Sequence, residues 1–336
     1  MSSNPTPPDS SASSSTPSGC PSIAEANSRT WTLDEIVRWT PPRGVKLLAV
    51  LGHPIRHSIS PQMHHAALHE LAQVDPSFAN WRYLRIEVPP ERLPGALPLL
   101  YIKGFQGINL TIPHKVDVLS LTKWVEPHPD AQQMGAVNTL LREGHRFLGF
   151  NTDGDGMDTA ILEALGIELT GQRIVLLGAG GAARAAAVQC LNRACAQLWL
   201  GNRSPERLDA LIETLKPIAE SSQLHSFCFD AWPQTATLLN KTADPLLIIN
   251  ATAAGLKSED LPPVDLSLLK IPFALFDMIY NPPITPLMRA AQSLDQPAVN
   301  GLDMLIYQGK FALDLWTDLD TSAELMRQAA QEALRA

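Results

Sequence analysis

The sequence predicts an α/β protein made of two domains. Three observations lead to this prediction: the length of 336 residues, the alternation of short apolar runs with helix-sized segments, and the restart of that alternation near residue 171. Domains average roughly 150 residues, so this length suggests about two of them. Strands that alternate with helices are typical of a parallel sheet that helices cover on both faces.

The N-terminal segment predicts a disordered tail rather than part of a domain. Residues 1–22 contain nine Ser, five Pro and no aromatic residue. Such a segment buries too little apolar area to offset the entropy of its chain. We therefore assign residues 1–30 to a tail and expect the folded part to begin near Trp31. The short amphipathic stretch Trp31–Trp39 is expected to pack on the first domain or to cap it.

The first series of apolar runs predicts an N-terminal α/β domain over residues 43–152. Its strands are expected at Lys46–Leu51, Trp81–Val88, Gln106–Thr111 and Val137–Leu141. A helix should begin near Pro61, and the segments 90–102 and 113–124 have the size of further helices. Polar and Gly residues cluster at Gly149–Asp153, where we place the joint between the domains.

The second series predicts another α/β domain over residues 153–283. Its strands are expected at Arg173–Leu177, Gln197–Leu200, Leu246–Asn250 and Phe273–Ile279. Helices are expected at Gly180–Asn192 and Pro205–Leu215. From Gly301 to Arg335 apolar residues recur at helical spacing. We expect residues 284–336 to pack back on the first domain as helices.

Composition excludes several classes of protein. The net charge of −8 argues against general binding to nucleic acid or to an anionic membrane. The longest apolar stretches are far shorter than the ~20 residues that a membrane span requires. The tail has neither the basic start nor the apolar core of a secretory signal. The four cysteines show no CxxC spacing, which is typical of reduced thiols. We expect a cytoplasmic protein that is a monomer or a homodimer.

A glycine-rich loop predicts a dinucleotide site in the second domain. Gly178, Ala179, Gly180, Gly181 and Ala182 follow a strong strand and open a helix. Gly178 permits a tight turn, and Gly180 lets the backbone approach a pyrophosphate. The helix N-terminus then supplies free N–H groups and the positive end of its dipole. This context predicts a Rossmann-like domain.

The end of the next strand favours NADP over NAD. An NAD site places an Asp or Glu there to bind the ribose 2′-OH. This strand is followed instead by Asn202, Arg203, Ser204 and Arg207, and the first acid is Glu206. The two arginines can grip a 2′-phosphate, with Ser204 as a neutral donor.

Four polar segments of the first domain predict a substrate pocket. Each lies at or just after a predicted strand; they are Gly52–His64, Asn109–Lys115, Gly135–Thr139 and Gly149–Gly154. Ligands of open α/β sheets bind at the carboxyl ends of strands. The segments supply hydroxyls, amides, one ammonium and one carboxylate, a set that suits a small, polyhydroxylated anion.

These segments, in this order, closely resemble the NADP-dependent shikimate dehydrogenase family, which includes quinate dehydrogenases. The resemblance continues through the glycine loop and Asn202–Ser204 to three later motifs, Asn250–Gly255, Asp277–Leu287 and Gly301–Gly309. It covers roughly residues 45–330. Many ordered motifs together are far more specific than a lone glycine fingerprint.

The resemblance assigns roles to individual residues. Lys115 and Asp153 are the implied catalytic pair. Ser58 and Ser60 would bind the substrate carboxylate with Tyr280 nearby. The side chains implied to bind the substrate ring hydroxyls are Thr111, Asn138 and Gln308. Asn109 is a further expected substrate-binding residue. Met278 and the Gly301 backbone would border the nicotinamide.

The implied reaction is reversible hydride transfer between NADPH and 3-dehydroshikimate, a step of chorismate and aromatic amino-acid biosynthesis. It needs no metal, because the cofactor carries the hydride chemistry. Two alternatives stay open: a relative that uses NAD or accepts quinate, and a catalytically silent NADP-binding regulator. Arg203 argues against NAD, the serines at 58 and 60 favour shikimate, and Lys115 with Asp153 argues against a silent protein.

Overall fold

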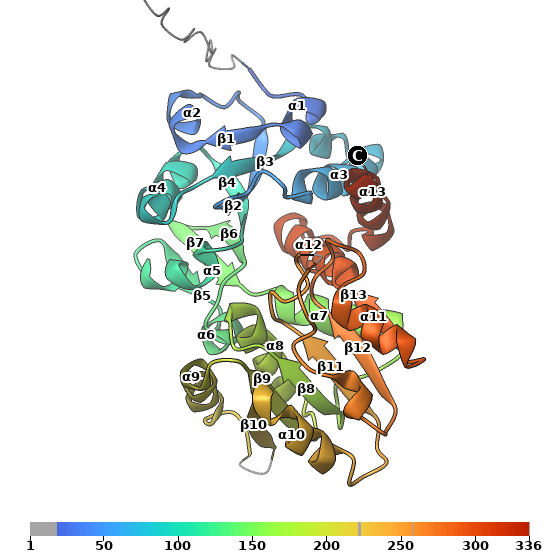
Figure 1. The fold of residues 1–336 in the computed structure, drawn as a ribbon. Coiled ribbons are helices and arrows are strands. Elements are labelled where there is room, and N and C mark those ends of the chain that lie inside the picture. The colour runs from blue at the N-terminus through green and yellow to red at the C-terminus, as the bar shows by residue number, and fades with distance from the viewer. Residues whose placement is uncertain (1–18, 221–222, 258, 336) are drawn as a thin grey trace, which may run out of the picture.

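The chain folds into two α/β halves, each built on its own sheet (Figure 1). The fold is taken from a computed structural model, which describes residues 19–220, 223–257 and 259–335. The predicted two-domain α/β architecture is confirmed. None of the helices in these ranges is both long and apolar enough to span a bilayer.

The first sheet has seven strands in the order β1-β3-β2-β4-β6-β7-β5. Their bounds are β1 (Thr30–Thr32), β2 (Lys46–Gly52), β3 (Trp81–Glu87), β4 (Phe105–Leu110), β5 (Val125–Pro127), β6 (Thr139–Glu143) and β7 (Arg146–Phe150). β1 to β4 run parallel, as predicted, but β6 is antiparallel to both β4 and β7. A turn at Gly144 with φ of +53° joins β6 to β7, and so short a link permits only an antiparallel pair.

Helices cover both faces of this sheet. They are α1 (Ile23–Ser28), α2 (Leu33–Arg38), α3 (Ser60–Val74), α4 (Leu93–Ile102), α5 (His114–Asp117) and α6 (Pro129–Met134). Alternate residues of β2 enter different cores, because side chains of a strand alternate between its faces. Leu47 and Leu51 pack with α2 and α4, whereas Leu48 and Val50 pack with α3.

The second sheet has six parallel strands in the order β10-β9-β8-β11-β12-β13. They are β8 (Arg173–Leu177), β9 (Gln197–Asn202), β10 (Leu224–Cys228), β11 (Leu246–Asn250), β12 (Phe273–Asp277) and β13 (Ala298–Asn300). The helices of this half are α8 (Gly181–Asn192), α9 (Pro205–Leu215), α10 (Trp232–Leu239) and α11 (Pro286–Ser293). The predicted strands Arg173–Leu177 and Leu246–Asn250 match β8 and β11 in both bounds.

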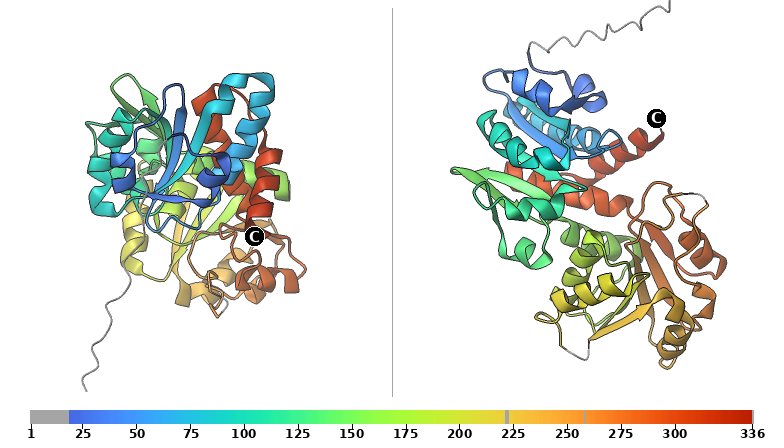
Figure 2. Two further views of the ribbon diagram at one scale, coloured as in Figure 1. Left: turned by 90° about the horizontal axis from the view of Figure 1, so that it is seen from above. Right: turned by 60° about the vertical axis from the view of Figure 1, so that its left-hand side comes forward.

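Three helices join the two halves. α7 (Asp153–Leu165) leads from the first sheet to the second, and α12 (Leu302–Thr317) lies along it. α13 (Ala323–Arg335) packs on α3, and Figure 2 shows these red C-terminal helices against the blue N-terminal half. The return was predicted from residue 284, which is wrong by about 17 residues. α11 packs on β12, and β13 extends the second sheet, so the chain returns only after Gly301.

The N-terminal boundary predicted at residue 30 is also wrong. Residues 1–18 lie outside the described ranges, but α1 and β1 are ordered elements that pack on the first sheet. Trp31 and Trp39 are buried, and both belong to the core beside β2 and β4. The composition that predicts a tail is that of residues 1–22, whereas residues 23–30 are ordered by their packing on β3 and α3. Of the two options for Trp31–Trp39, packing on the first domain is the one observed.

Candidate active site

A cavity of about 340 Å³ lies where the two halves meet. Polar side chains from several chain segments line it: Ser58, Ser60, Asn109, Thr111, Lys115, Asp153, Tyr280 and Gln308. The loops after β2 and β4 and the start of α7 supply most of them, while the second half adds Met278, Tyr280 and Gly301. The fold thus brings together segments that are far apart in the sequence.

Lys115 and Asp153 form an ion pair inside this cavity. The Lys115 Nζ donates to Asp153 Oδ2 at 2.8 Å. Lys115 lies in the short helix α5, and its carbonyl accepts from the Val137 N–H at 2.8 Å. Asp153 is the first residue of α7, where the helix dipole stabilises a carboxylate. The Lys115 side chain is 30% exposed and the Asp153 side chain 13% exposed, so a ligand can reach both.

Asn138 fixes the other oxygen of Asp153. Its Nδ2 donates to Asp153 Oδ1 at 3.0 Å and also lies 3.4 Å from Gln308 Oε1. Its Oδ1 accepts from the Thr152 backbone N–H at 2.8 Å, which orients the amide. Asn138 does not line the cavity itself. The two polar atoms of its side chain instead bind Asp153, which lines the cavity, and Thr152 next to it.

Ser58 and Ser60 form one wall of the cavity at the start of α3. The Ser58 hydroxyl donates to Ser60 Oγ at 3.1 Å. The Ser60 N–H donates to Ser58 Oγ at 3.3 Å, and Pro61 has no N–H, so the two hydroxyls are the main donors at this end of α3. Tyr280 lines the cavity from the second half, and burial raises the pKa of its hydroxyl. Two neighbouring hydroxyl donors suit a carboxylate ligand.

The loop after β12 carries the second half's contribution. Asp277 is fully buried and accepts from Asn250, the Ile279 N–H and Thr285, at 3.0, 3.1 and 2.6 Å. Burial raises the pKa of this carboxyl, and the three hydrogen bonds oppose that shift. A Cβ on Gly301 would lie 2.2 Å from the Met278 carbonyl oxygen. Only glycine allows the close approach of Gly301 and Met278 at the cavity edge.

The glycine loop after β8 has the form that a pyrophosphate requires. Gly178 has a φ of +117°, and a Cβ there would lie 2.9 Å from the Ala251 carbonyl oxygen. α8 begins at Gly181 without a side-chain cap, so its first N–H groups remain available to an anion. The positions that a Cβ would occupy on Gly180 and Gly181 have no atom within 4 Å. The segment Gly178–Ala182 can therefore hold a dinucleotide phosphate.

The end of β9 presents two exposed arginines, Arg203 and Arg207. Ser204 caps α9, and its hydroxyl donates to Glu206 at 2.8 Å. The Asn202 side chain donates to the Ser204 carbonyl at 3.0 Å and shapes the turn. Arg203 and Arg207 can reach an anion from this turn, whereas Ser204 must first release Glu206 to donate to one.

Three residues that shape the site were given no individual role in the sequence analysis, although two of them, Thr139 and Thr152, lie in its polar segments. Thr152 donates its hydroxyl to the Gln308 carbonyl at 2.9 Å, which links α7 to α12. Tyr83 and Thr139 bind the two ends of the Asn109 side chain, at 2.7 and 3.0 Å. A tyrosine hydroxyl on the inward face of a predicted strand was the available signal for Tyr83.

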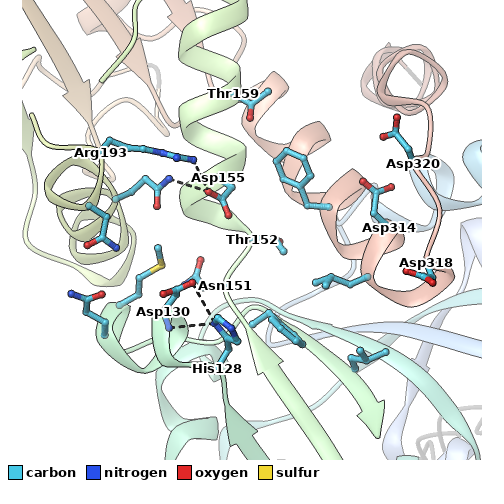
Figure 3. Close-up of a pocket in the computed structure, with 18 of the residues that line it drawn as sticks. His128, Asp130, Asn151, Thr152, Asp155, Thr159, Arg193, Asp314, Asp318 and Asp320 are labelled. Carbon is cyan, nitrogen blue, oxygen red and sulfur yellow. Dashed lines mark hydrogen bonds and ion pairs between the residues drawn. The ribbon is translucent and has the colours of Figure 1, made fainter. Parts of the chain in front are cut away.

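A larger cavity of about 1240 Å³ lies elsewhere, among α6, α7, α8 and α12 (Figure 3). None of the predicted site residues lines it. Asp155 there is bound by Arg193 at 3.2 Å and by Gln189 at 3.1 Å. Within the described ranges, no three His, Cys, Asp or Glu side chains are grouped so that they could hold a metal ion.

Two family models match the chain. Residues 50–140 match the shikimate dehydrogenase substrate binding domain. Residues 301–331 match the shikimate 5'-dehydrogenase C-terminal domain. The two matches contain Lys115 and Gln308, which both line the cavity.

Curated relatives match most of the chain. It is 35% identical over 291 residues to a shikimate dehydrogenase (NADP(+)) of Geobacter metallireducens, covering 86% of this chain and 97% of that protein. It is 40% identical over 286 residues to a shikimate dehydrogenase (NADP(+)) of Thermus thermophilus, covering 85% and 98%.

A solved structure supports the same relationship. Shikimate 5-dehydrogenase from Thermus thermophilus, in complex with NADP(H) and shikimate, superposes with a TM-score of 0.72 at 35% identity. The superposition covers 86% of this chain and all of that one. With this fold and these relatives, the chain belongs to the shikimate dehydrogenase family.

Proposed function

We propose that the chain is an NADP-dependent shikimate dehydrogenase, which reversibly reduces 3-dehydroshikimate to shikimate. The observation that carries the proposal is the Lys115–Asp153 pair, at 2.8 Å, in a cavity that both halves line. The relatives named for NADP(+) and the structure with NADP(H) and shikimate support this cofactor and substrate. The reaction belongs to chorismate and aromatic amino-acid biosynthesis.

The two halves bind different ligands. The first sheet with α12 and α13 holds the small-molecule substrate, and the second sheet holds NADP. Ser58 and Ser60 bind the substrate carboxylate, and Thr111 and Gln308 face its hydroxyls. Asn138, which does not line the cavity, acts behind them by holding the Asp153 carboxylate at 3.0 Å. The amides at the start of α8 would hold the pyrophosphate, and Arg203 and Arg207 the 2′-phosphate. NADPH, when bound, supplies the hydride.

Lys115 stabilises the negative charge that develops on the substrate oxygen during the reaction. Reduction of a ketone builds negative charge on its oxygen, and an ammonium beside that oxygen stabilises it and delivers a proton. Asp153 holds the Lys115 Nζ at 2.8 Å, so the ammonium is in place before the charge develops. In the reverse direction Lys115 takes the proton back from the substrate hydroxyl.

One assay tests this proposal against its alternatives. Absorbance at the nicotinamide band is followed with shikimate and with quinate, each in the presence of NADP+ and of NAD+. We expect turnover with shikimate and NADP+ to exceed the other three combinations by at least about tenfold in kcat/KM, because pockets built on polar contacts discriminate strongly. Preference for quinate or NAD+ would indicate the dehydrogenase alternative. No turnover in any arm, with NADP+ still bound, would indicate the silent regulator.

A further inference from the structure

A tyrosine hydroxyl lies beneath the substrate cavity and takes no part in the chemistry described above. Tyr83 is on β3 and has no exposed surface. It pairs with Leu48 of β2, which pairs with Gly107 of β4, so one strand separates Tyr83 from Asn109. The Tyr83 hydroxyl crosses that strand and donates to Asn109 Oδ1 at 2.7 Å.

With this hydrogen bond, both polar atoms of the Asn109 side chain have partners. The Asn109 Nδ2 donates to Thr139 Oγ1 at 3.0 Å and lies 3.3 Å from the Asn138 carbonyl oxygen. A flipped amide would turn its oxygen toward that carbonyl, so the orientation is unique. Asn109 lines the cavity but is only 6% exposed. Without Tyr83, its buried oxygen would lose the donor that holds it.

Burial also keeps this hydroxyl in its donor form. Burial raises the pKa of Tyr83, so the neutral hydroxyl retains the proton that it donates to Asn109 Oδ1 at 2.7 Å.

The Tyr83 ring cannot swing away from this position. His64 stacks on it with centroids 4.1 Å apart and planes inclined by 9°. Trp316 lies against His64 at 5.5 Å. The Tyr83 N–H donates to His65 Nε2 at 3.0 Å. Contacts on ring and backbone hold the hydroxyl at one point, as preorganised binding requires.

We propose that Tyr83 is a positioning residue for substrate binding, whose hydroxyl holds the Asn109 side-chain amide in the orientation that it presents to the cavity. The inference rests on the proposed function, because the ligand it positions for is shikimate. It differs from a structural role in one respect. A structural residue stabilises the fold, whereas Tyr83 also sets the affinity for the ring substrate and leaves that for NADP+ unchanged.

The test compares Tyr83→Phe with Tyr101→Phe. The Tyr101 hydroxyl also donates to one acceptor, the Gly144 carbonyl at 2.6 Å, but it does not line the cavity. We expect Tyr83→Phe to raise KM for shikimate about tenfold, to change kcat less than about threefold and to leave KM for NADP+ within about twofold. Tyr101→Phe should leave all three unchanged. Calorimetric Kd values for shikimate provide a readout that does not depend on turnover.

A double variant tests the route of the effect. If Tyr83 acts through Asn109, then Tyr83→Phe added to Asn109→Ala should raise KM much less than it does alone. A folded Tyr83→Phe protein with unchanged KM and Kd for shikimate, beside an active wild type, would overturn this inference alone. Equal weakening of shikimate and NADP+ would do the same, since it indicates a general structural role. A wild type that neither binds nor turns over shikimate would overturn the proposed function, and this inference with it.

Discussion

The Lys115 ammonium lies 2.8 Å from the Asp153 carboxylate, although 38 residues separate the two in the sequence. Lys115 follows β4, and Asp153 begins the helix that leads to the second sheet. Asn138 holds the second oxygen of the same carboxylate at 3.0 Å. The pair is therefore held from both sides at the point where the two halves meet.

Lys115→Ala should abolish most turnover without loss of nucleotide binding. Without the ammonium, nothing at this point stabilises the oxygen charge or supplies the proton, so kcat should fall by about a thousandfold or more. The Kd for NADP+ should change less than about twofold, because Lys115 is in the other half of the molecule. Stopped-flow and fluorescence titration measure the two quantities. Lys46→Ala, at an exposed lysine of β2, is the matched control. A fully active Lys115→Ala enzyme would refute the catalytic assignment.

Arg203→Ala should discriminate between the two dinucleotides. Arg203 is exposed at the end of β9, where a 2′-phosphate would be bound if NADP is the cofactor. Loss of a charge-assisted contact should raise KM for NADP+ by roughly 10- to 100-fold, with KM for NAD+ nearly constant. Arg43→Ala, at an exposed arginine of the first half, controls for the loss of one positive charge. Equal changes in both KM values would argue against a phosphate clamp.

Local motifs allowed much of the candidate site to be predicted, because each polar segment directly follows a strand. The carboxyl ends of β2, β4 and β12 meet at one cavity, so side chains from separate segments of the sequence converge there. Tyr83 was not predicted, since its role depends on a contact across β2 that no local pattern encodes. The ordered strand β1 was missed for the same reason. Its three residues pair with residues of β3 that lie 55 positions further along the chain, from Thr30 with Arg85 to Thr32 with Glu87.

Trp31→Ala should destabilise the protein although the residue lies next to a Ser- and Pro-rich segment. Trp31 has no exposed surface, packs 5.3 Å from Trp39 and lies under the Arg29 guanidinium at 4.1 Å. Truncation of a buried tryptophan lowers the free energy of unfolding by about 3–5 kcal/mol. Urea titration followed by circular dichroism measures that change. Val37→Ala in the same segment, where the side chain is 51% exposed, should change it by less than about 0.5 kcal/mol. Equal, small effects would mean that this segment adds nothing to stability.

The buried histidine His65 should make the protein less stable as the pH falls. Its Nε2 accepts from the Tyr83 N–H at 3.0 Å, so the neutral ring carries its hydrogen on Nδ1, 2.5 Å from Asn27 Oδ1. Burial lowers the pKa of His65 to about 4, against about 6.5 in the unfolded chain. Between these values the unfolded state binds one proton more than the folded state, so stability rises with pH and is lost as pH falls.

The expected loss from His65 is about 1.4 kcal/mol for each pH unit between roughly 6.5 and 4. His64, with a pKa of about 3 that burial lowers in the same way, adds a similar slope. His65→Gln keeps a polar side chain but cannot take up the proton, so it should flatten the dependence by about one proton. Urea unfolding at a series of pH values measures the slope. His69→Gln, at an exposed position of the same helix, should leave it unchanged. If His65→Gln and wild type share one slope, the ring is not held neutral by burial, and its bond to Tyr83 does not resist protonation.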